Sequence, residues 1–229
     1  MTRLGVITGL QREVRCLASL ADSVSIACAG ADSERARVQT RSLLKQGCQA
    51  IVSFGIAGGL DPEVEPGTVV IAQEVLAPDG TRYSADPEWR DRVLSDLADH
   101  VAPSPVIGGA IAGSGRIIAT AAEKRALLYR TGAVAVDMES HAVGEVASSR
   151  GVRFIVIRAV ADSAERKVPE SASHAIAEDG SERIAAVVGH LAVRPWELPS
   201  LIALARANAR ATQALRRVVL RLGPEFGLG

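Results

Sequence analysis

Short apolar runs alternate with helix-like segments along most of the chain, and this order limits the fold more than any other feature of the sequence. The runs occupy residues 3–9, 24–30, 50–59, 67–77, 106–114, 133–137 and 153–162. Several are apolar at consecutive positions, as in strands that are covered on both faces, and the segments between them have helical periodicity. The pattern therefore predicts an α/β protein in which helices cover both faces of a sheet.

Length, charge and cysteine content narrow the class of protein further. The 229 residues, 48% of them hydrophobic, suit one globular domain at 1–195 with a helical extension at 196–229. Because 26 basic residues balance 26 acidic ones, no overall positive field would recruit nucleic acid. No apolar run approaches the ~20 residues of a membrane-spanning helix. The odd cysteines (Cys16, Cys28 and Cys48) lack metal-site spacing and fit reduced thiols in a cytoplasmic protein.

Acidic residues stand where three of the apolar runs end, which is where ligands bind in α/β sheets. Glu13 follows the first run, Asp137 and Glu139 stand at the end of 133–137, and Asp162 ends 153–162. If 133–137 and 153–162 are parallel strands joined by the intervening helix, Asp137, Glu139 and Asp162 share one edge of the sheet. The periodicity thus predicts an acidic crevice.

Each of these signals also has an ordinary structural explanation. A carboxylate such as Glu139 in the first turn of a helix interacts favourably with the helix dipole, worth ~0.3–1 kcal/mol, and Asp162 suits an N-cap. His141 is expected in a solvated or hydrogen-bonded role at the surface. The glycine-rich turn "FGIAGG" at 54–59 is neither GxGxxG nor a P-loop, and GxSxG, HExxH and Cys/His clusters are absent, so neither a metal nor a bound cofactor is expected.

Four motifs in order resemble those of the nucleoside phosphorylase/nucleosidase superfamily, which includes purine nucleoside phosphorylase and methylthioadenosine/S-adenosylhomocysteine nucleosidase. They are "TGLQREV" at 8–14, "GIAGG" at 55–59, "VDME" at 136–139 and "RAVAD" at 158–162. The longer stretches 54–62, 123–143, 158–166 and 194–217 are similar to the hopanoid-associated branch, whose proposed substrate is adenosylhopane. The resemblance implies a three-layer α/β/α fold with a central mixed sheet and a C-terminal helical extension, and a homo-oligomer.

The resemblance also assigns roles to individual residues. It implies that Asp162 protonates N7 of adenine, that Glu139 accepts hydrogen bonds from the ribose 2′- and 3′-hydroxyls, that Met138 packs on the sugar and that Glu13 positions or deprotonates water. It places the remaining candidates in two groups: Asp137, Gly58, Ile117 and Ile118 around the substrate, and Arg158, Gly55, Ile56, Arg35 and Arg116 around the nucleophile or a phosphate ion.

Three departures from the family pattern leave the nucleophile open. Ile56 replaces a serine that helps to hold the nucleophile, and Asp137 is shorter than the usual glutamate. Ile117 stands about where the nucleosidases have a phenylalanine that contacts the base. Glu13 favours water, because a second carboxylate repels inorganic phosphate. The usual name of the hopanoid branch implies phosphate as co-substrate, and we expect phosphorolysis slightly ahead of hydrolysis.

The segment 199–222 has apolar residues on one helical face and an arginine-rich stripe on the other. Such a helix packs on the domain or on a neighbouring subunit. Alternatively, it binds peripherally to the cytoplasmic face of a membrane, where the enzyme would meet a lipid-linked nucleoside. The expected function is release of adenine from adenosylhopane in hopanoid biosynthesis. The alternatives are a methylthioadenosine/S-adenosylhomocysteine-type nucleosidase and, from another class, a non-catalytic nucleoside-binding or membrane-scaffold protein.

Overall fold

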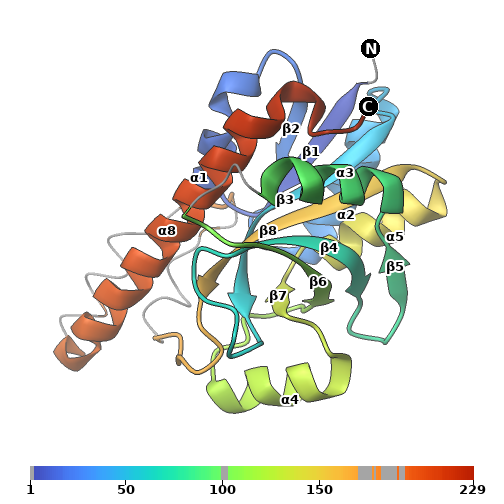
Figure 1. The fold of residues 1–229 in the computed structure, drawn as a ribbon. Helices are drawn as coiled ribbons and strands as arrows, with labels where there is room; N and C mark the ends of the chain where they lie inside the picture. Colours follow the sequence, from blue (N-terminus) through green and yellow to red (C-terminus); the bar gives the residue numbers. More distant parts are fainter. Residues whose placement is uncertain (1–2, 99–102, 170–176, 178, 182–189, 191–193) are drawn as a thin grey trace.

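The computed structural model describes residues 3–98, 103–169, 177, 179–181, 190 and 194–229, and it contains one mixed sheet (Figure 1). The strand order begins β2-β1-β3-β7-β6-β4-β5, and β8 pairs with both β3 and β4. The strands are β1 (Leu4–Thr8), β2 (Ser25–Cys28), β3 (Ala50–Gly59), β4 (Val69–Leu76), β5 (Arg82–Ser84), β6 (Val106–Gly113), β7 (Ala135–Asp137) and β8 (Arg153–Asp162).

Five of these strands close a ring. Strand β3 pairs with β8 in parallel and with β7 in antiparallel orientation, β8 pairs with β4 antiparallel, and β6 pairs with β4 and β7 in parallel. The ring forms because β3 is long: its first four residues pair with β1, residues 50–58 pair with β8, and its last two residues also pair with β7. The ends of β3, β7 and β8 are thereby held next to one another.

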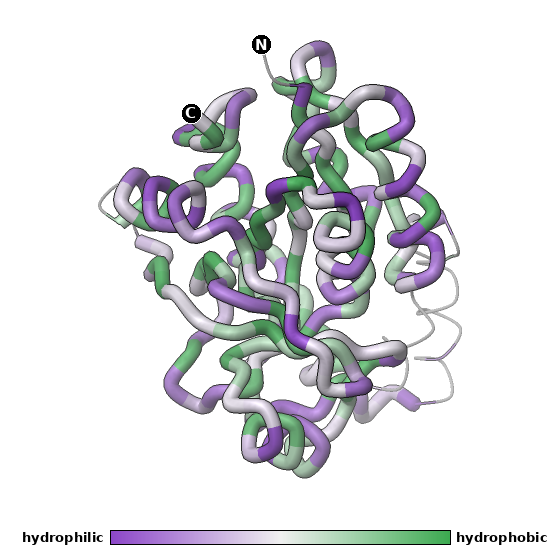
Figure 2. Tube along the Cα trace, turned by 90° about the vertical axis from the view of Figure 1, so that its right-hand side faces the viewer, coloured by the Kyte–Doolittle hydropathy of each residue, from purple (hydrophilic) through white to green (hydrophobic). Residues whose placement is uncertain are grey.

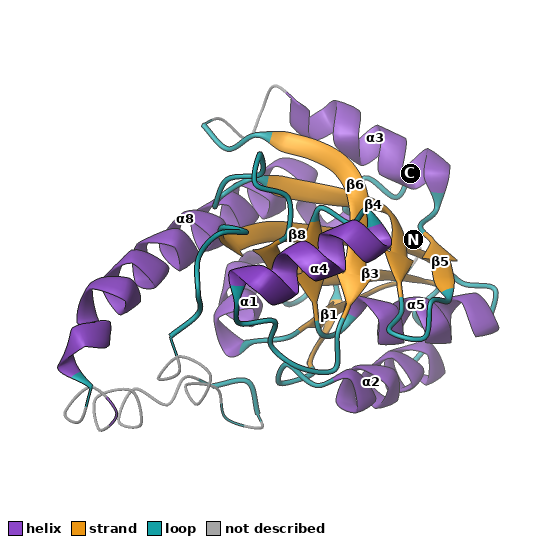
Figure 3. Ribbon diagram, turned by 90° about the horizontal axis from the view of Figure 1, so that it is seen from below, coloured by secondary structure: helices purple, strands orange, loops and turns teal. Residues whose placement is uncertain are grey.

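Helices cover both faces of the sheet, which confirms the expected three-layer α/β/α arrangement with a C-terminal helix (Figure 3). Helices α1, α3 and α8 pack on one face and α2 and α5 on the other, while α4 covers the end of the sheet near β6 and β7. The helices are α1 (Gln11–Cys16), η1 (Ala18–Leu20), α2 (Ser33–Lys45), α3 (Pro87–Ala98), α4 (Ala121–Thr131), α5 (Ser140–Ser149), η2 (Pro195–Glu197), α8 (Leu198–Leu222) and η3 (Gly223–Glu225).

The C-terminal helix α8 shares a hydrophobic core with the sheet. Its residues Leu215 and Val219 are buried with strand residues of β1, β3, β4 and β8. The segment after the helix is fixed as well, because the Phe226 ring meets Phe54 of β3 edge to face and the Phe226 carbonyl accepts a hydrogen bond from Trp89 Nε1 at 2.7 Å. Hydrophobic residues concentrate on the central strands in Figure 2. Within the described part of the chain, no helix is long and apolar enough to cross a membrane.

Two local expectations were wrong. Strands β7 and β8 are not parallel neighbours. The short β7 pairs antiparallel with the far end of β3 and parallel with β6, whereas β8 runs parallel to β3, so β7 and β8 run in opposite directions. The segment "FGIAGG" is not a turn but the second half of β3, with a register shift between Ala57 and Gly58. In this register Gly58 lies between Val136 of β7 and Asp162 of β8, so the acidic residues meet across three strands.

Candidate active site

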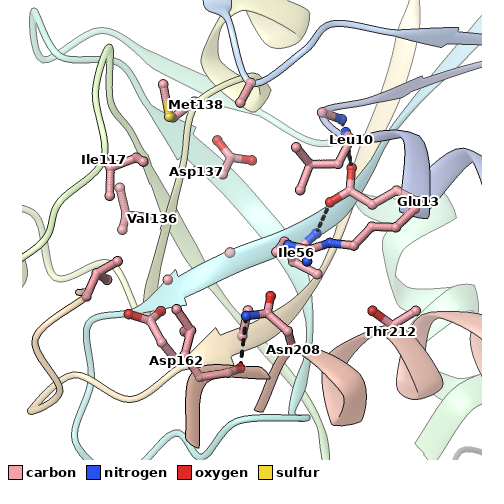
Figure 4. A pocket seen from close by; sticks show the side chains of 18 of the residues that line it. Leu10, Glu13, Ile56, Ile117, Val136, Asp137, Met138, Asp162, Asn208 and Thr212 are labelled. Carbon is pink, nitrogen blue, oxygen red and sulfur yellow. Dashed lines mark hydrogen bonds between the residues drawn. The ribbon is translucent and has the colours of Figure 1, made fainter. Parts of the chain in front are cut away.

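A cavity of about 930 Å³ opens where the ends of β3, β7 and β8 meet, with α1 and α8 as its walls (Figure 4). Most of the residues expected at the site from the sequence line it. In Figure 4, Glu13 lies beside Leu10 and Ile56, whereas Asp162 lies on the side of Ile117 and Val136. The cavity is lined by the expected residues Glu13, Ile56, Gly58, Arg116, Ile117, Ile118, Asp137, Met138, Glu139 and Asp162.

Arg158 of β8 lies behind the cavity wall and acts as a counter-ion for the acidic residues. It is fully buried, with Nε 2.6 Å from Asp137 Oδ2 and Nη2 3.3 Å from Glu139 Oε2. Nη2 also donates to the hydroxyls of Ser53 at 2.8 Å and Ser140 at 3.1 Å. Burial alone would lower the arginine pKa, but the neighbouring carboxylates, Asp137 foremost, raise it above its ordinary value. Arg158 therefore stays charged, and its charge is taken up by protein carboxylates.

Asp137 is occupied by protein partners rather than facing a ligand with free oxygens. Its Oδ1 accepts the backbone N–H of Ser140 at 3.1 Å, and its Oδ2 accepts the Ser140 hydroxyl and faces the Arg158 guanidinium. With its carboxylate oxygens so engaged, Asp137 fixes the start of α5 and the position of Arg158.

Glu139 lies just before α5 as its N-cap residue, not in its first turn, and its side chain makes no capping bond. The side chain turns toward Arg158 and toward Gly9, where a Cβ atom would come within 2.5 Å of Glu139 Oε1. Burial raises the pKa of Glu139 to about 8. The negative charges of Asp137 and Glu13 raise this pKa further, and the positive charge of Arg158 lowers it. Below that pH the carboxyl both donates and accepts hydrogen bonds, which suits a pair of neighbouring hydroxyl groups.

Glu13 of α1 is held by three backbone donors. Its Oε2 accepts the N–H groups of Gly9 at 2.8 Å and Leu10 at 2.9 Å, and its Oε1 accepts the N–H of Ile56 at 2.8 Å. A carboxylate offers about four lone-pair positions, so about one remains for a ligand. Burial raises the pKa of Glu13, although Arg158 and the Ile56 and Leu10 amides act against it. A fixed carboxylate with a raised pKa is a stronger base than an ordinary glutamate and is suited to take a proton from water.

Asp162 at the end of β8 is paired with a lysine that the sequence analysis missed. The Lys124 ammonium of α4 contacts Asp162 Oδ2, and the lysine is completely buried. Burial raises the pKa of Asp162, while the charge of Lys124 and its hydrogen bond lower it. Lys124 shares a helix face with Leu127 and Leu128, and a lysine on an apolar face was a signal readable from the sequence. Ser53, a polar residue inside the apolar run 50–59, was another.

Helix α8 also forms a wall of the cavity. The sequence predicted that this helix packs on the domain or a neighbouring subunit, or contacts a membrane surface, and it does pack on the domain. Leu201, Leu204 and Ala205 line the cavity toward the start of the helix, and Asn208 and Thr212 follow farther along. Asn208 donates to the Leu204 carbonyl at 3.0 Å, and its buried Oδ1 has no hydrogen-bond partner among the described residues. An amphipathic pattern predicts that one face of a helix is buried, but it does not indicate what that face contacts. The role of α8 in the site therefore could not be predicted from the sequence.

Besides Arg158, two expected site residues, Arg35 and Gly55, do not line the cavity, and His141 is not in its expected surroundings. Arg35 donates to the carbonyls of Ala29 at 2.7 Å and Gly30 at 2.9 Å, so it anchors the β2–α2 connection. Gly55 lies behind Glu13, where an added Cβ would come within 2.6 Å of the Glu13 carboxyl carbon. His141 is buried rather than at the surface, because α5 packs its first turn against the sheet, and burial lowers its pKa.

Comparisons with known proteins place the chain in a family. Residues 13–194 match the model of the phosphorylase superfamily. The chain is 29% identical over 154 residues to the 5′-methylthioadenosine/S-adenosylhomocysteine nucleosidase of Mycobacterium bovis, an alignment that covers 52% of this chain and 60% of the relative. It is 32% identical over 127 residues to the futalosine hydrolase of Streptomyces coelicolor, covering 49% of this chain and 53% of that protein. The matches thus span between half and two thirds of these curated relatives.

Solved structures agree at the level of the fold. The 5′-methylthioadenosine/S-adenosylhomocysteine nucleosidase of Helicobacter pylori superposes with a TM-score of 0.71 at 15% identity, covering 96% of this chain and 97% of that structure. The native futalosine hydrolase of Helicobacter pylori gives a TM-score of 0.69 at 14% identity, covering 94% and 96%. Because the family model covers most of the chain and the same fold recurs in these structures, the chain belongs to the phosphorylase superfamily.

Proposed function

We propose that this protein cleaves the N-glycosidic bond of an adenine nucleoside. The observation that carries the proposal is the separation of carboxyl groups in one cavity, with Asp162 on the side of Ile117 and Glu13 beside Ile56 (Figure 4). Bond cleavage needs a proton on the leaving base and a nucleophile at the sugar carbon. Asp162 supplies the proton to N7 of adenine, and Glu13 lies on the side where the nucleophile attacks.

The sugar lies between these two groups in this proposal. Glu139 holds the ribose hydroxyls, and Met138 packs against the ring from the same end of β7. Ile117 and Ile118 form the apolar wall against which adenine lies. The transition state of such a reaction carries positive charge on the ribosyl group, and the ionised carboxylate of Glu13 stabilises that charge.

The buried charges favour water as the nucleophile. Three carboxyl groups, those of Glu13, Asp137 and Glu139, surround a single guanidinium, that of Arg158. An inorganic phosphate would be repelled by the ionised carboxylates of Glu13 and Asp137. Two arginines expected around a phosphate ion are directed to protein groups: Nε and Nη2 of Arg158 to Asp137, Glu139 and Ser53, and Arg35 to the carbonyls of Ala29 and Gly30. The alternative, phosphorolysis, is favoured by a different observation: Arg12, Arg15, Arg116 and Arg216 line the cavity.

The wall formed by α8 supports a substrate with a bulky apolar group on the 5′ carbon. Cavities of ~300–1,000 Å³ hold drug-sized ligands, so about 930 Å³ is spacious for a nucleoside alone. Leu201, Leu204 and Ala205 continue the cavity with an apolar surface. The start of the same helix also presents large exposed apolar side chains, Leu198 and Ile202, at 48% and 44% exposure. We therefore propose adenosylhopane, an adenine nucleoside with a hydrocarbon 5′ group, as the substrate, reached at a membrane surface.

The runner-up substrates are methylthioadenosine and S-adenosylhomocysteine, as the names of the relatives suggest. The methylthio group of the first would leave most of the apolar surface of α8 uncovered, and the charged amino-acid end of the second does not match an apolar surface, which is why we rank them second. A non-catalytic nucleoside-binding or membrane-scaffold protein is the least consistent with the site, because binding alone requires neither a carboxyl group held at the leaving base nor a second one held by three backbone donors.

A substrate panel tests the proposal. The purified chain is incubated with adenosylhopane in mixed detergent micelles, with methylthioadenosine and with adenosine, and adenine release is followed by chromatography. We expect the highest kcat/KM with adenosylhopane. A higher value with methylthioadenosine would reject the hydrocarbon substrate, and no adenine from any of the three would reject the enzyme.

Two variants of α8 test whether the helix selects the hydrocarbon. Leu204→Glu places a charge on the cavity wall, and Leu220→Glu places the same charge on an exposed position, 78% accessible, of the same helix. Loss of the contact of one leucine is worth about 1.5–3 kcal/mol, so the preference of L204E for adenosylhopane over adenosine should fall about tenfold or more. L220E should keep the wild-type preference.

A further inference from the structure

Lys124 is the one fully buried ammonium among the described residues, and it points at the residue proposed to protonate the base. It stands in the first turns of α4, which begins at a capping box formed by Thr120 and Glu123. The ammonium contacts Asp162 Oδ2 and donates to the Ser163 carbonyl at 2.8 Å and to the Arg166 carbonyl at 3.4 Å. All three N–H groups of the ammonium are thereby used, so its orientation is fixed.

This contact divides the two oxygens of Asp162 between different partners. Oδ2 faces Lys124, whereas Oδ1 lies beside Gly58, where an added Cβ would come within 3.1 Å of it. Asp162 and Gly58 both line the cavity. The absence of a side chain at position 58 therefore leaves room at the oxygen that Lys124 does not hold, and that oxygen is available to a base.

The contact also joins the acid to the wall on which the base would lie. The segment with Ile117 and Ile118 runs directly into α4, so one buried side chain connects the end of β8 with the helix that follows this wall. A lysine is an expensive residue to bury, because an unpaired ammonium in a low-dielectric interior loses its hydration, and its presence here depends on Asp162.

The charges around the pair are few. Burial raises the pKa of Asp162, and Lys124, then the backbone amide of Gly59 and then Arg166 act against this rise. Glu123 on α4 is directed to Thr120 and to Arg116, whose Nη2 lies 2.8 Å away. Asp137 on β7 is directed to Arg158. Lys124 is therefore the principal cation acting on Asp162.

We propose that Lys124 is a positioning residue for Asp162: it turns the free oxygen of the carboxyl group toward N7 of the base and limits how much of the acid form is present at neutral pH. This inference rests on the proposed adenine-releasing function. A group that donates a proton is active only while protonated, so activity falls as the pH rises through its pKa. Lys124 favours the ionised form of Asp162. The fall of kcat/KM at high pH, the basic limb of the profile, therefore occurs at a lower pH than burial alone would give.

The test compares three replacements at this position. Lys124→Met removes the charge, Lys124→Gln removes the charge but retains a hydrogen-bond donor that keeps the site folded, and Lys124→Arg retains a cation. A neighbouring cation lowers the pKa of an aspartate by about 1–3 pH units, so the basic limb of K124M and K124Q should move up by that amount while K124R keeps the wild-type limb. Lys45→Met, at an exposed position at the end of α2, is the matched control and should not move the limb.

A second measurement does not depend on activity. Carbon-13 spectra of protein labelled at the aspartate carboxyl carbons report the titration of Asp162, whose signal is assigned by its loss in Asp162→Asn. We expect the titration to move to higher pH in K124M and K124Q. Because Lys124 acts through Asp162, adding K124M to D162N should cause little further loss of kcat, whereas two independent residues would give losses that multiply.

The outcomes separate the two levels of the argument. If the folded charge-removing variants keep the wild-type basic limb and the wild-type Asp162 titration, or if their losses multiply with that of D162N, the role of Lys124 is rejected while the proposed function stands. If wild-type protein releases no adenine from any nucleoside, the proposed function is rejected, and the carbon-13 titration alone decides whether Lys124 controls the protonation of Asp162.

Discussion

Replacing Glu139 with glutamine should remove much of the pH dependence of stability between pH 5 and 8. In the unfolded chain this carboxyl group ionises near the ordinary glutamate value of 4.5, whereas burial in the folded protein raises its pKa to about 8. The folded state therefore binds this proton more tightly than the unfolded state does. The resulting stabilisation is fully present below pH 4.5 and is lost as the pH rises through about 8.

The size of the effect follows from the interval between the two pKa values. At about 1.4 kcal/mol per pH unit, the interval from 4.5 to about 8 corresponds to on the order of 5 kcal/mol of unfolding free energy. Glutamine has the shape of the protonated glutamate and cannot ionise, so the E139Q variant should lose less stability than the wild type between pH 5 and 8. The contributions of Glu13, Asp162 and His141 occur in both proteins and largely cancel in the difference.

Urea denaturation provides the measurement. The fluorescence of Trp89, a fully buried residue of α3, reports unfolding, and titrations at pH 5.5, 6.5 and 7.5 give the free energy at each pH. Glu63→Gln, which alters an exposed carboxylate, is the control and should follow the wild type. If E139Q loses stability with pH as steeply as the wild type, Glu139 is ionised throughout this range and our description of the buried acidic cluster is wrong.

Two further predictions concern the positions of the reacting groups. Gly55→Ala should lower kcat/KM by about 100-fold or more, because its Cβ would displace Glu13 and Arg158, whereas Gly108→Ala, whose Cβ meets Leu94 Cδ1 at 3.9 Å, should retain activity. Equal activity of the two alanine variants would mean that the position of Glu13 is unimportant. Asp162→Asn should lower kcat by about 10²–10⁴-fold while adenine still binds, as judged by calorimetry. Wild-type turnover in D162N would remove Asp162 from the mechanism.

The sequence predicted the layers of the fold and the meeting of the acidic residues, but not the path by which they meet. Strand β7 has three residues, and the direction of so short a strand is set by its partners rather than by its own pattern. Asp137 and Asp162 come together because β3 continues through "FGIAGG" and pairs with both strands. The expected acidic crevice is present although the expected parallel pairing is not.

Inside the site, the residues that line the cavity were easier to anticipate than those that hold them. Glu13, Glu139 and Asp162 stand at the ends of apolar runs, where the pattern itself indicates a ligand site. The partners of these acids, Arg158 and Lys124, lie at positions where periodicity alone predicts a buried apolar residue, and what each one contacts depends on tertiary packing. For the same reason α8 was predicted as an amphipathic helix, but not as a wall of the cavity.

The most direct test of the central claim is adenine release from methylthioadenosine and adenosylhopane, measured with and without inorganic phosphate while the sugar product is followed by phosphorus-31 spectroscopy. The arrangement of Glu13, Glu139 and Arg158 predicts that adenine appears at the same rate in both conditions and that no sugar phosphate forms. Release that requires phosphate, with a new sugar phosphate signal, would contradict water as the nucleophile, and no release of adenine from either compound would contradict the enzyme itself.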